Sequence, residues 1–205
     1  MDLPKLYSQE APVRFPVCCL SISNKLLQIL TDVFSNTALS GSDETPTVLS
    51  IGSGSGILEA LLLAHSQSRS LLNIEGVEVQ QLGGKAPVNR YLPEQAIYTV
   101  RGTWDVISRL QDPDVTALMF VYPRQPGLIS EYIKAITEQD LKVQVIVWLG
   151  PMADWEVFEP CFSTRNGTEQ FVVSERRQGT EAGLDEYELM AVVRRTVHGQ
   201  GQTPP

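Results

Sequence analysis

The sequence contains few cysteines and histidines. Among its 205 residues there are three cysteines and two histidines. No Cys-x-x-Cys pair or Cys/His cluster is present, so the sequence predicts no metal site. We interpret Cys18, Cys19 and Cys161 as small core residues. His65 and His198 have no recognisable triad or metal partner and are expected to be structural or solvated.

Positive charge and long hydrophobic runs are also scarce. Lys and Arg number 16 against 24 Asp and Glu, which gives a net charge of −8 and argues against non-specific nucleic-acid binding. No apolar run approaches the roughly 18–20 residues of a membrane span. Residues 1–16 lack the apolar core of a secretion signal. We therefore expect a cytoplasmic protein that acts on a small-molecule substrate and binds neither nucleic acid nor a membrane. The sequence does not determine the oligomeric state.

One stretch dominates the sequence. Thr47 to Leu63 reads TVLSIGSGSGILEALLL, an apolar run followed by three glycines and a second apolar run. This pattern predicts a buried strand, a tight glycine turn and a helix that opens onto the turn. The free N–H groups at such a helix N-terminus favour an anion or a polar ligand group.

The glycine spacing separates two classes of ligand. Dinucleotide folds use G-x-G-x-x-G, whereas this chain has G-x-G-x-G, with Ile57 in place of the third glycine. The stretch resembles the first motif of class I S-adenosylmethionine-dependent methyltransferases, [DE]-x-G-x-G-x-G after a strand. Ser50 replaces the family's acidic residue, which affects one polar contact near the methionine end of the cofactor. The resemblance implies S-adenosyl-L-methionine as cofactor, bound near Ser50, Gly52, Ser53, Gly54 and Gly56.

A glutamate follows at the end of the next predicted strand, Leu71–Val79. A carboxylate at this position can accept hydrogen bonds from both ribose hydroxyls of a bound nucleoside. Glu78, with Val79 beside it, is therefore a predicted cofactor residue, although dinucleotide enzymes and methyltransferases share this device. Glu75 is a competitor, but the strand register favours Glu78.

The turn after the third predicted strand, Ala96–Arg101, is the next candidate. In the family that the chain resembles, this turn holds the adenine. Gly102, Thr103 and Trp104 occupy that place, and Asp105 is near enough in sequence to reach the exocyclic amine. Ordinary core packing is an equal alternative for Trp104.

The most hydrophobic predicted strand is Thr116–Tyr122. Its continuous apolar run is typical of a central parallel strand buried on both faces. Because ligands of open α/β sheets lie outside the carboxyl ends of strands, we expect Tyr122 and the loop after it beside the site. The loop loosely resembles the N-P-P-[YF] motif of some methyltransferases. Tyr122 replaces its Asn and Arg124 interrupts the proline pair, so that chemistry is not carried over.

The remaining elements define the expected fold. A helix is predicted to begin near Ser21 or Ser23. Further helices are predicted over 104–111, capped by Thr103, and over 127–139, and Asp154 is expected to cap a short helix. The aromatic residues Trp155, Phe158 and Phe162 near that helix fit either a substrate pocket or the core. Strands are predicted at 143–149, which Gly150 and Pro151 should end, and at 170–173 and 188–193, with a polar loop over 174–186.

Five strand–helix alternations before a terminal strand pair predict an α/β three-layer sandwich. It should have a mainly parallel seven-stranded sheet, an antiparallel terminal hairpin and helices on both faces. The resemblance implies that the seventh strand is antiparallel and inserted beside the fifth. We expect an arm over residues 1–20, a single methyltransferase-like domain over 21–195 and a disordered tail over 196–205.

Methyl transfer from S-adenosyl-L-methionine to oxygen or nitrogen of a small organic acceptor is the first functional hypothesis. No catalytic residue is assigned. Asp105, Tyr122 and Asp154 are candidate bases only because they follow predicted strands. The second hypothesis is a methyltransferase-like protein without methyl transfer, acting as a scaffold, a partner subunit or a rearrangement or cyclisation catalyst. An NAD-dependent oxidoreductase is a third, which the glycine spacing opposes.

Overall fold

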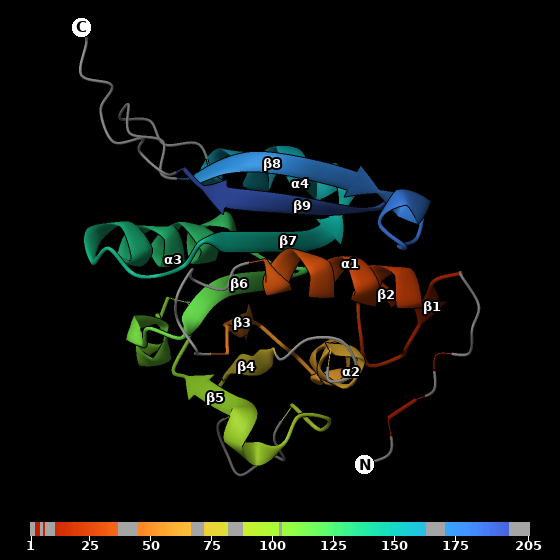
Figure 1. Ribbon diagram of the computed structural model, residues 1–205, viewed down its shortest axis with the longest axis horizontal. Helices are drawn as coiled ribbons and strands as arrows, with labels where there is room; N and C mark the ends of the chain where they lie inside the picture. The colour runs from red at the N-terminus through yellow and green to blue at the C-terminus, as the bar shows by residue number, and fades with distance from the viewer. Residues whose placement is uncertain are drawn as a thin grey trace, which may run out of the picture.

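The computed structural model describes residues 3–4, 6, 11–36, 45–66, 72–81, 88–102, 104–162 and 171–196. Seven strands form one sheet in the order β5-β4-β3-β6-β7-β9-β8, which runs from bottom to top in Figure 1. The first five are parallel, and β9 lies antiparallel between β7 and β8. The predicted fold, including the inserted last strand, is confirmed. The strands are β3 (Thr47–Ile51), β4 (Asn73–Val79), β5 (Ile97–Val100), β6 (Val115–Val121), β7 (Val145–Pro151), β8 (Phe171–Gln178) and β9 (Glu188–Arg195).

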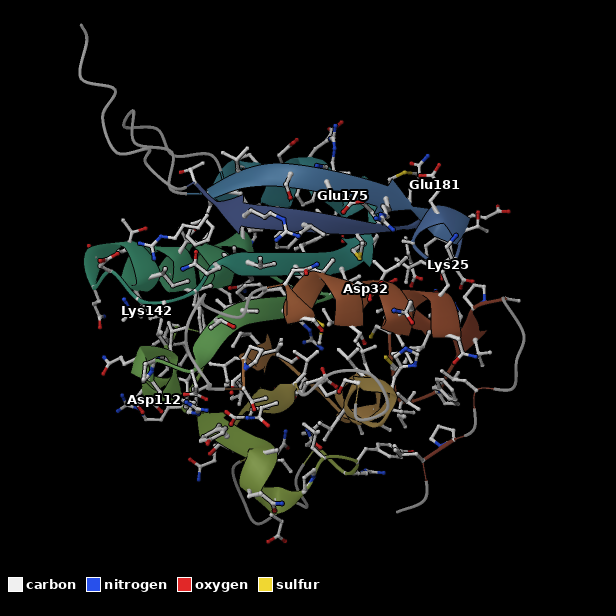
Figure 2. All side chains as sticks on the ribbon, viewed as in Figure 1. Lys25, Asp32, Asp112, Lys142, Glu175 and Glu181 are labelled. Carbon is white, nitrogen blue, oxygen red and sulfur yellow. The ribbon has the colours of Figure 1, made fainter. Side chains whose placement is uncertain are left out.

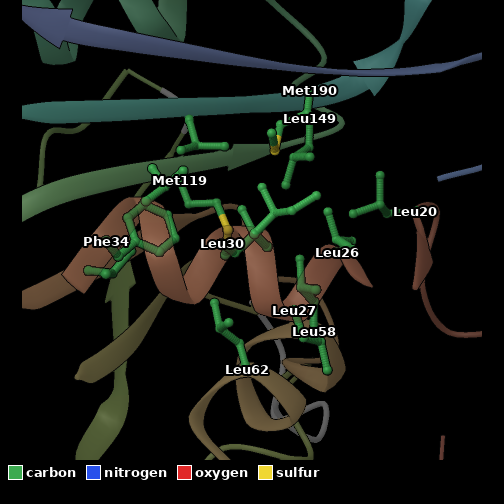
Figure 3. Packing of buried hydrophobic residues seen from close by; sticks show 14 of the residues in the cluster. Leu20, Leu26, Leu27, Leu30, Phe34, Leu58, Leu62, Met119, Leu149 and Met190 are labelled. Atoms are coloured by element: carbon green, nitrogen blue, oxygen red, sulfur yellow. The ribbon is translucent and has the colours of Figure 1, made fainter. Parts of the chain in front are cut away.

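Helices cover both faces of this sheet (Figure 1). Successive side chains of a strand point to opposite faces, so neighbouring residues belong to different core layers. Val48 packs with α1 and α2, whereas Leu49 packs with α3 and α4. Figure 3 shows Leu30 of α1 facing Met119 of the sheet in the first layer. The four helices are α1 (Asn24–Ser35), α2 (Ile57–Ser66), α3 (Pro126–Glu138) and α4 (Trp155–Phe158).

The N-terminal segment is not simply an irregular arm. It forms a hairpin of β1 (Val13–Arg14) and β2 (Ser21–Ile22). Its buried residues Leu20 and Ile22 join the core beside α1. Ser23 is the N-cap of α1, because its Oγ accepts a hydrogen bond of 3.1 Å from the Leu26 N–H. Ser21, the other candidate cap, lies in β2.

The prediction of a helix over 104–111 is wrong. Only a 3-10 turn, η2 (Ser108–Gln111), forms there, and Thr103 lies outside the described residues. The side chain of Arg109 explains the difference, because it turns toward the sheet and binds Glu75 and Asp114. These tertiary ion pairs fix the backbone in a conformation that local helix propensity does not favour.

The strand ends also differ from the predictions. β8 continues through Gln178, so the first part of the predicted loop over 174–186 is strand. Its alternating exposure suits an edge strand, with Val172, Ser174, Arg176 and Gln178 exposed. Gly150 and Pro151 are the last residues of β7 and do not stop it earlier. Residues 37–44 and the predicted tail from 197 lie outside the described residues.

The aromatic residues after β7 belong to the core. The Trp155 ring lies 5.2 Å from that of Trp148 and 5.9 Å from that of Phe162, and Phe158 packs in the same cluster. Phe162 lies in η4 (Glu159–Phe162), and the Asp154 side chain makes no capping hydrogen bond to α4. Core packing, not a substrate pocket, accounts for these rings.

Charged side chains lie at the surface, and Figure 2 labels Lys25, Asp32, Asp112, Lys142, Glu175 and Glu181. On α1, Lys25 and Asp32 are exposed on the side of the helix that faces away from the core. No helix within the described parts of the chain combines the length and apolar character that crossing a bilayer requires.

Candidate functional site

A cavity of about 620 Å³ lies at the carboxyl ends of the parallel strands. Its walls come from the turn after β3, the end of β4 and the loop after β6. The chain leaves β3 toward β4 on one side and returns to β6 on the other, which makes this edge the topological switch point of the sheet. Open α/β sheets bind ligands at such a point. The volume lies in the range of small-molecule sites.

The glycine turn forms one wall of the cavity. Gly52, Gly54 and Gly56 all have left-handed backbone conformations, with φ of 80°, 55° and 76°. At Gly56 there is also no room for a side chain, because a Cβ would lie 2.3 Å from Oδ1 of Asn89. Asn89 in turn donates to Ser53 Oγ at 3.3 Å, so it supports the turn from behind.

Sequence reasoning missed Asn89. It lies in the stretch 80–94, which the glycines and prolines predict only as a broken element. Its amide oxygen accepts from the Leu92 N–H at 3.1 Å, and the Arg90 N–H donates to the Ser55 carbonyl at 2.9 Å. No local sequence pattern indicates these contacts.

Glu78 reaches from the end of β4 to the glycine turn. Its Oε2 accepts from the Gly54 N–H at 2.8 Å, and its Oε1 accepts from the Val79 N–H at 3.0 Å. Each carboxylate oxygen keeps a lone pair for a further donor. Glu75, the competitor, instead binds Arg109 at 2.9 and 3.0 Å and does not line the cavity.

The N-terminal arm contributes another wall. Val17, Cys18 and Cys19 line the cavity. Cys19 is exposed, so the expectation of a small core residue is wrong for this cysteine. Cys18 and Cys161 are half-buried and pack against the core. Burial raises the pKa of the Cys18 thiol to about 12, which keeps it protonated at neutral pH.

Tyr122 connects the cavity to the arm. Its φ of 49° is in the left-handed region, an uncommon conformation for an aromatic residue. Its hydroxyl donates to Oε1 of Glu188 at 2.6 Å. Glu188 also accepts from Arg14 at 3.1 Å, so one buried carboxylate holds both the arm and the residue that follows β6.

No protein-family model matches the chain, and no curated protein sequence matches it. Among solved structures, a human methyltransferase 10 domain containing protein aligns with a TM-score of 0.53 and 12% identity, over 85% of this chain and 83% of that one. The methyltransferase domain of bacterial CtHen1-CN aligns with a TM-score of 0.51 and 16% identity, over 83% and 97%. A Thermoplasma acidophilum protein aligns with a TM-score of 0.52 and 11% identity, over 93% and 92%. The chain has the class I methyltransferase fold. At these identities the likeness concerns the fold alone.

Within this methyltransferase fold, the predicted cofactor residues divide into three groups. Three do not line the cavity: Ser50 is buried beneath the turn, Gly56 is covered by Asn89, and Trp104 is 73% exposed beside Gly102. Thr103 lies outside the described residues. The other seven line the cavity, and cofactor binding by them stays a prediction: Gly52, Ser53, Gly54, Glu78, Val79, Gly102 and Tyr122.

None of the three candidate bases is suited to accept a proton. Asp105 lines the cavity, but hydrogen bonds from the Arg101 N–H and guanidinium lower the pKa of its carboxyl. Burial and the hydrogen bond to Glu188 raise the pKa of Tyr122, so its phenol stays protonated. Asp154 is exposed and does not line the cavity.

A further carboxylate, which sequence reasoning missed, lies beneath the glycine turn of this methyltransferase fold. Glu59 of α2 is 2% exposed and lines the cavity. It accepts a hydrogen bond of 2.5 Å from the hydroxyl of Ser50. A signal was present in the sequence, since Glu59 is the one charged residue within an otherwise apolar run.

Proposed function

We propose that this protein transfers the methyl group of S-adenosyl-L-methionine to oxygen or nitrogen of a small organic acceptor. The observation that carries the proposal is the cavity at the switch point of the sheet, where the glycine turn and the Glu78 carboxylate share one wall. Backbone N–H groups and a carboxylate at the carboxyl ends of strands suit the ribose of a nucleoside cofactor.

The residues on this wall fit the cofactor. The lone pairs left on Glu78 suit the two ribose hydroxyls, and Gly102 and Asp105 line the region expected for the adenine. Val79 and Val100 provide apolar surface for the base. When bound, S-adenosyl-L-methionine supplies a methyl group on a sulfonium, which is electrophilic. The chain's own contribution is to hold donor and acceptor in line, which supplies several kcal/mol without a protein base.

A small acceptor is favoured by the arm and the charge. Val17, Cys18 and Cys19 of the arm and the loop after β6 line the cavity together with the glycine turn. The net charge of −8 disfavours nucleic acid as acceptor.

Calorimetric titration with S-adenosylhomocysteine tests the cofactor assignment. We expect micromolar binding by the wild type, its loss in Glu78→Ala, and no change in Glu131→Ala, which removes an exposed glutamate of α3. Formation of S-adenosylhomocysteine from S-adenosyl-L-methionine in the presence of small amines, phenols and carboxylates then tests transfer. A folded wild type that does not bind would refute the proposal. Binding without turnover on any acceptor would favour the cofactor-binding protein without methyl transfer.

A further inference from the structure

The buried carboxylate of Glu59 is the least satisfied polar group on the cavity wall. Its Oε1 accepts from Ser50, but its Oε2 has no hydrogen-bond partner among the residues that the structure describes. A buried polar atom without a partner typically costs 1–3 kcal/mol, and more when it is charged. Such an atom beside a cavity calls for a donor that enters the cavity.

The surroundings of Glu59 select a cationic donor. No Lys or Arg within the described ranges pairs with Glu59. The titratable groups that act on it are the Glu78 carboxylate from β4 and the Cys18 thiol from the arm. Burial is the main cause that raises the pKa of Glu59 to about 7. A positive ligand group would favour the ionised form and fill the vacant oxygen.

The position of Glu59 relative to the glycine turn identifies the ligand group. Glu78 approaches the turn from β4, and Glu59 approaches it from α2, beneath Ser50. The two carboxylates therefore serve two ends of one ligand, a ribose diol at Glu78 and an ammonium group at Glu59. The cofactor of the proposed function carries both groups.

We propose that Glu59 binds the α-ammonium group at the amino-acid end of S-adenosyl-L-methionine, as the carboxylate that Ser50 does not provide. Ser50 acts as a positioning residue, since its hydroxyl holds Oε1 of Glu59 at 2.5 Å. The carboxylate beside the turn thus comes from the first turn of α2 and not from the end of β3. This inference rests on the proposed function.

A comparison of two ligands tests it. S-adenosylhomocysteine has the α-ammonium group, whereas 5′-deoxy-5′-methylthioadenosine has the same adenosine and sulfur but no amino acid. We expect Glu59→Gln to weaken S-adenosylhomocysteine binding roughly 10-fold or more and to leave methylthioadenosine binding unchanged. Glu131→Gln, an exposed substitution with the same charge change, should affect neither ligand.

A double variant and a proton count add independent readouts. Ser50→Asp combined with Glu59→Gln should recover S-adenosylhomocysteine affinity, because it returns a carboxylate to the adjacent position. In the wild type near pH 7, S-adenosylhomocysteine should displace a measurable fraction of a proton per site, since binding ionises Glu59. Methylthioadenosine should displace none. Calorimetry in buffers of different ionisation enthalpy measures this without any variant.

The outcomes separate the two proposals. Wild-type binding of S-adenosylhomocysteine that Glu59→Gln leaves intact overturns the role of Glu59 and keeps the proposed function. Equal weakening of both ligands also overturns it, because Glu59 would then only shape the turn. Failure of the folded wild type to bind S-adenosylhomocysteine overturns the proposed function, and the inference with it.

Discussion

For single residues, the clearest pH effect belongs to Glu59, because its ionisation in the folded protein costs free energy. Its folded pKa of about 7 lies above its ordinary value of 4.5, so the folded state binds its proton more tightly than the unfolded state does. Its contribution to stability is therefore complete below about pH 4.5 and is lost as the pH rises to about 7. A functional site commonly retains such a penalty because activity requires the group.

The first prediction compares the wild type with Glu59→Gln, whose side chain does not titrate. Between pH 4.5 and pH 7, the free energy of unfolding of the wild type should fall relative to that of the variant, by on the order of 2–3 kcal/mol. Urea unfolding at a series of pH values measures the difference. A difference that stays constant over this window would show that Glu59 is ionised in the folded protein throughout.

The second prediction concerns Gly56 in the turn. Alanine there must adopt a φ of 76° and also displace the Asn89 amide, so Gly56→Ala should destabilise the fold by about 2–4 kcal/mol. Gly127→Ala is the matched control, because a Cβ at Gly127 meets no atom within 4 Å in α3. That control should stabilise the protein by about 0.5 kcal/mol. Thermal unfolding of both variants measures the two changes in stability. Equal changes for Gly56→Ala and Gly127→Ala would contradict the close packing of Asn89 on Gly56.

Among the structural elements, β9 and the turn before it hold the arm through two carboxylates, Glu188 and Asp185, which both pair with Arg14. Glu188 of β9 is fully buried and accepts hydrogen bonds from donors on several segments. Two donors are in the arm, Arg14 and Ser21, and Tyr122 follows β6. Asp185 supplies a backbone N–H at 3.2 Å. The position of the arm beside the cavity thus depends on β9. Ser21 and Glu188 are 167 positions apart in the sequence.

The third prediction follows from this attachment. Glu188→Gln keeps the shape of the side chain but removes the buried one of the two charges that pair with Arg14, and Asp185 keeps its ion pair. The arm should open more often, and modification of the half-buried Cys18 by a thiol reagent should become several-fold faster. Cys161, whose thiol contacts the Pro126 carbonyl at 3.5 Å, is the internal reference and should not change. Mass spectrometry of the labelled peptides resolves the two sites, and equal rates for Cys18 in both proteins would contradict the role of Glu188.

At the scale of the whole molecule, Arg109 joins separate parts of the sheet. It lies outside the strands, in η2, and pairs with Glu75 of β4 at 2.9 Å and with Asp114 at 2.5 Å. Asp114 also accepts from the Thr47 hydroxyl at the start of β3. The hydrogen bond from Arg109 is the main cause that lowers the pKa of Asp114 to about 2.

The fourth prediction uses this cluster. Arg109→Met leaves two part-buried carboxylates without their cation and should destabilise the protein by about 3 kcal/mol at pH 7. Because the pKa of Asp114 is lowered in the folded state, this stability exists above about pH 4 and is lost as the pH falls toward 2. Urea unfolding at pH 7 and pH 2.5 should show the difference between variant and wild type shrinking.

A control on the surface completes that test. Arg101 pairs with Asp105 at 3.1 Å, but its side chain is 83% exposed. Arg101→Met should therefore change the free energy of unfolding by less than about 0.5 kcal/mol. If both substitutions have the same small effect, Arg109 does not hold the sheet together.

The elements that could be predicted from the sequence are those whose signals are local. The apolar runs around the three glycines predicted β3, the turn and α2, because strand and helix periodicity and the backbone freedom of glycine act within a few residues. The continuous apolar run at 116–121 predicted a central strand for the same reason. Glu78 was located because the end of a strand is itself a local feature.

Contacts between separate segments account for what the sequence did not predict. A 3-10 turn forms in place of a predicted helix around Arg109, whose partner Glu75 lies on β4. The closure of the cavity by the arm depends on Glu188, and the support of the turn depends on Asn89. In the sequence, Ser50 indicated only that the acidic residue of the resembled motif is absent. That a carboxylate from α2 lies beside it is a consequence of how the helix packs on the strand, and no pattern along the chain encodes that distance.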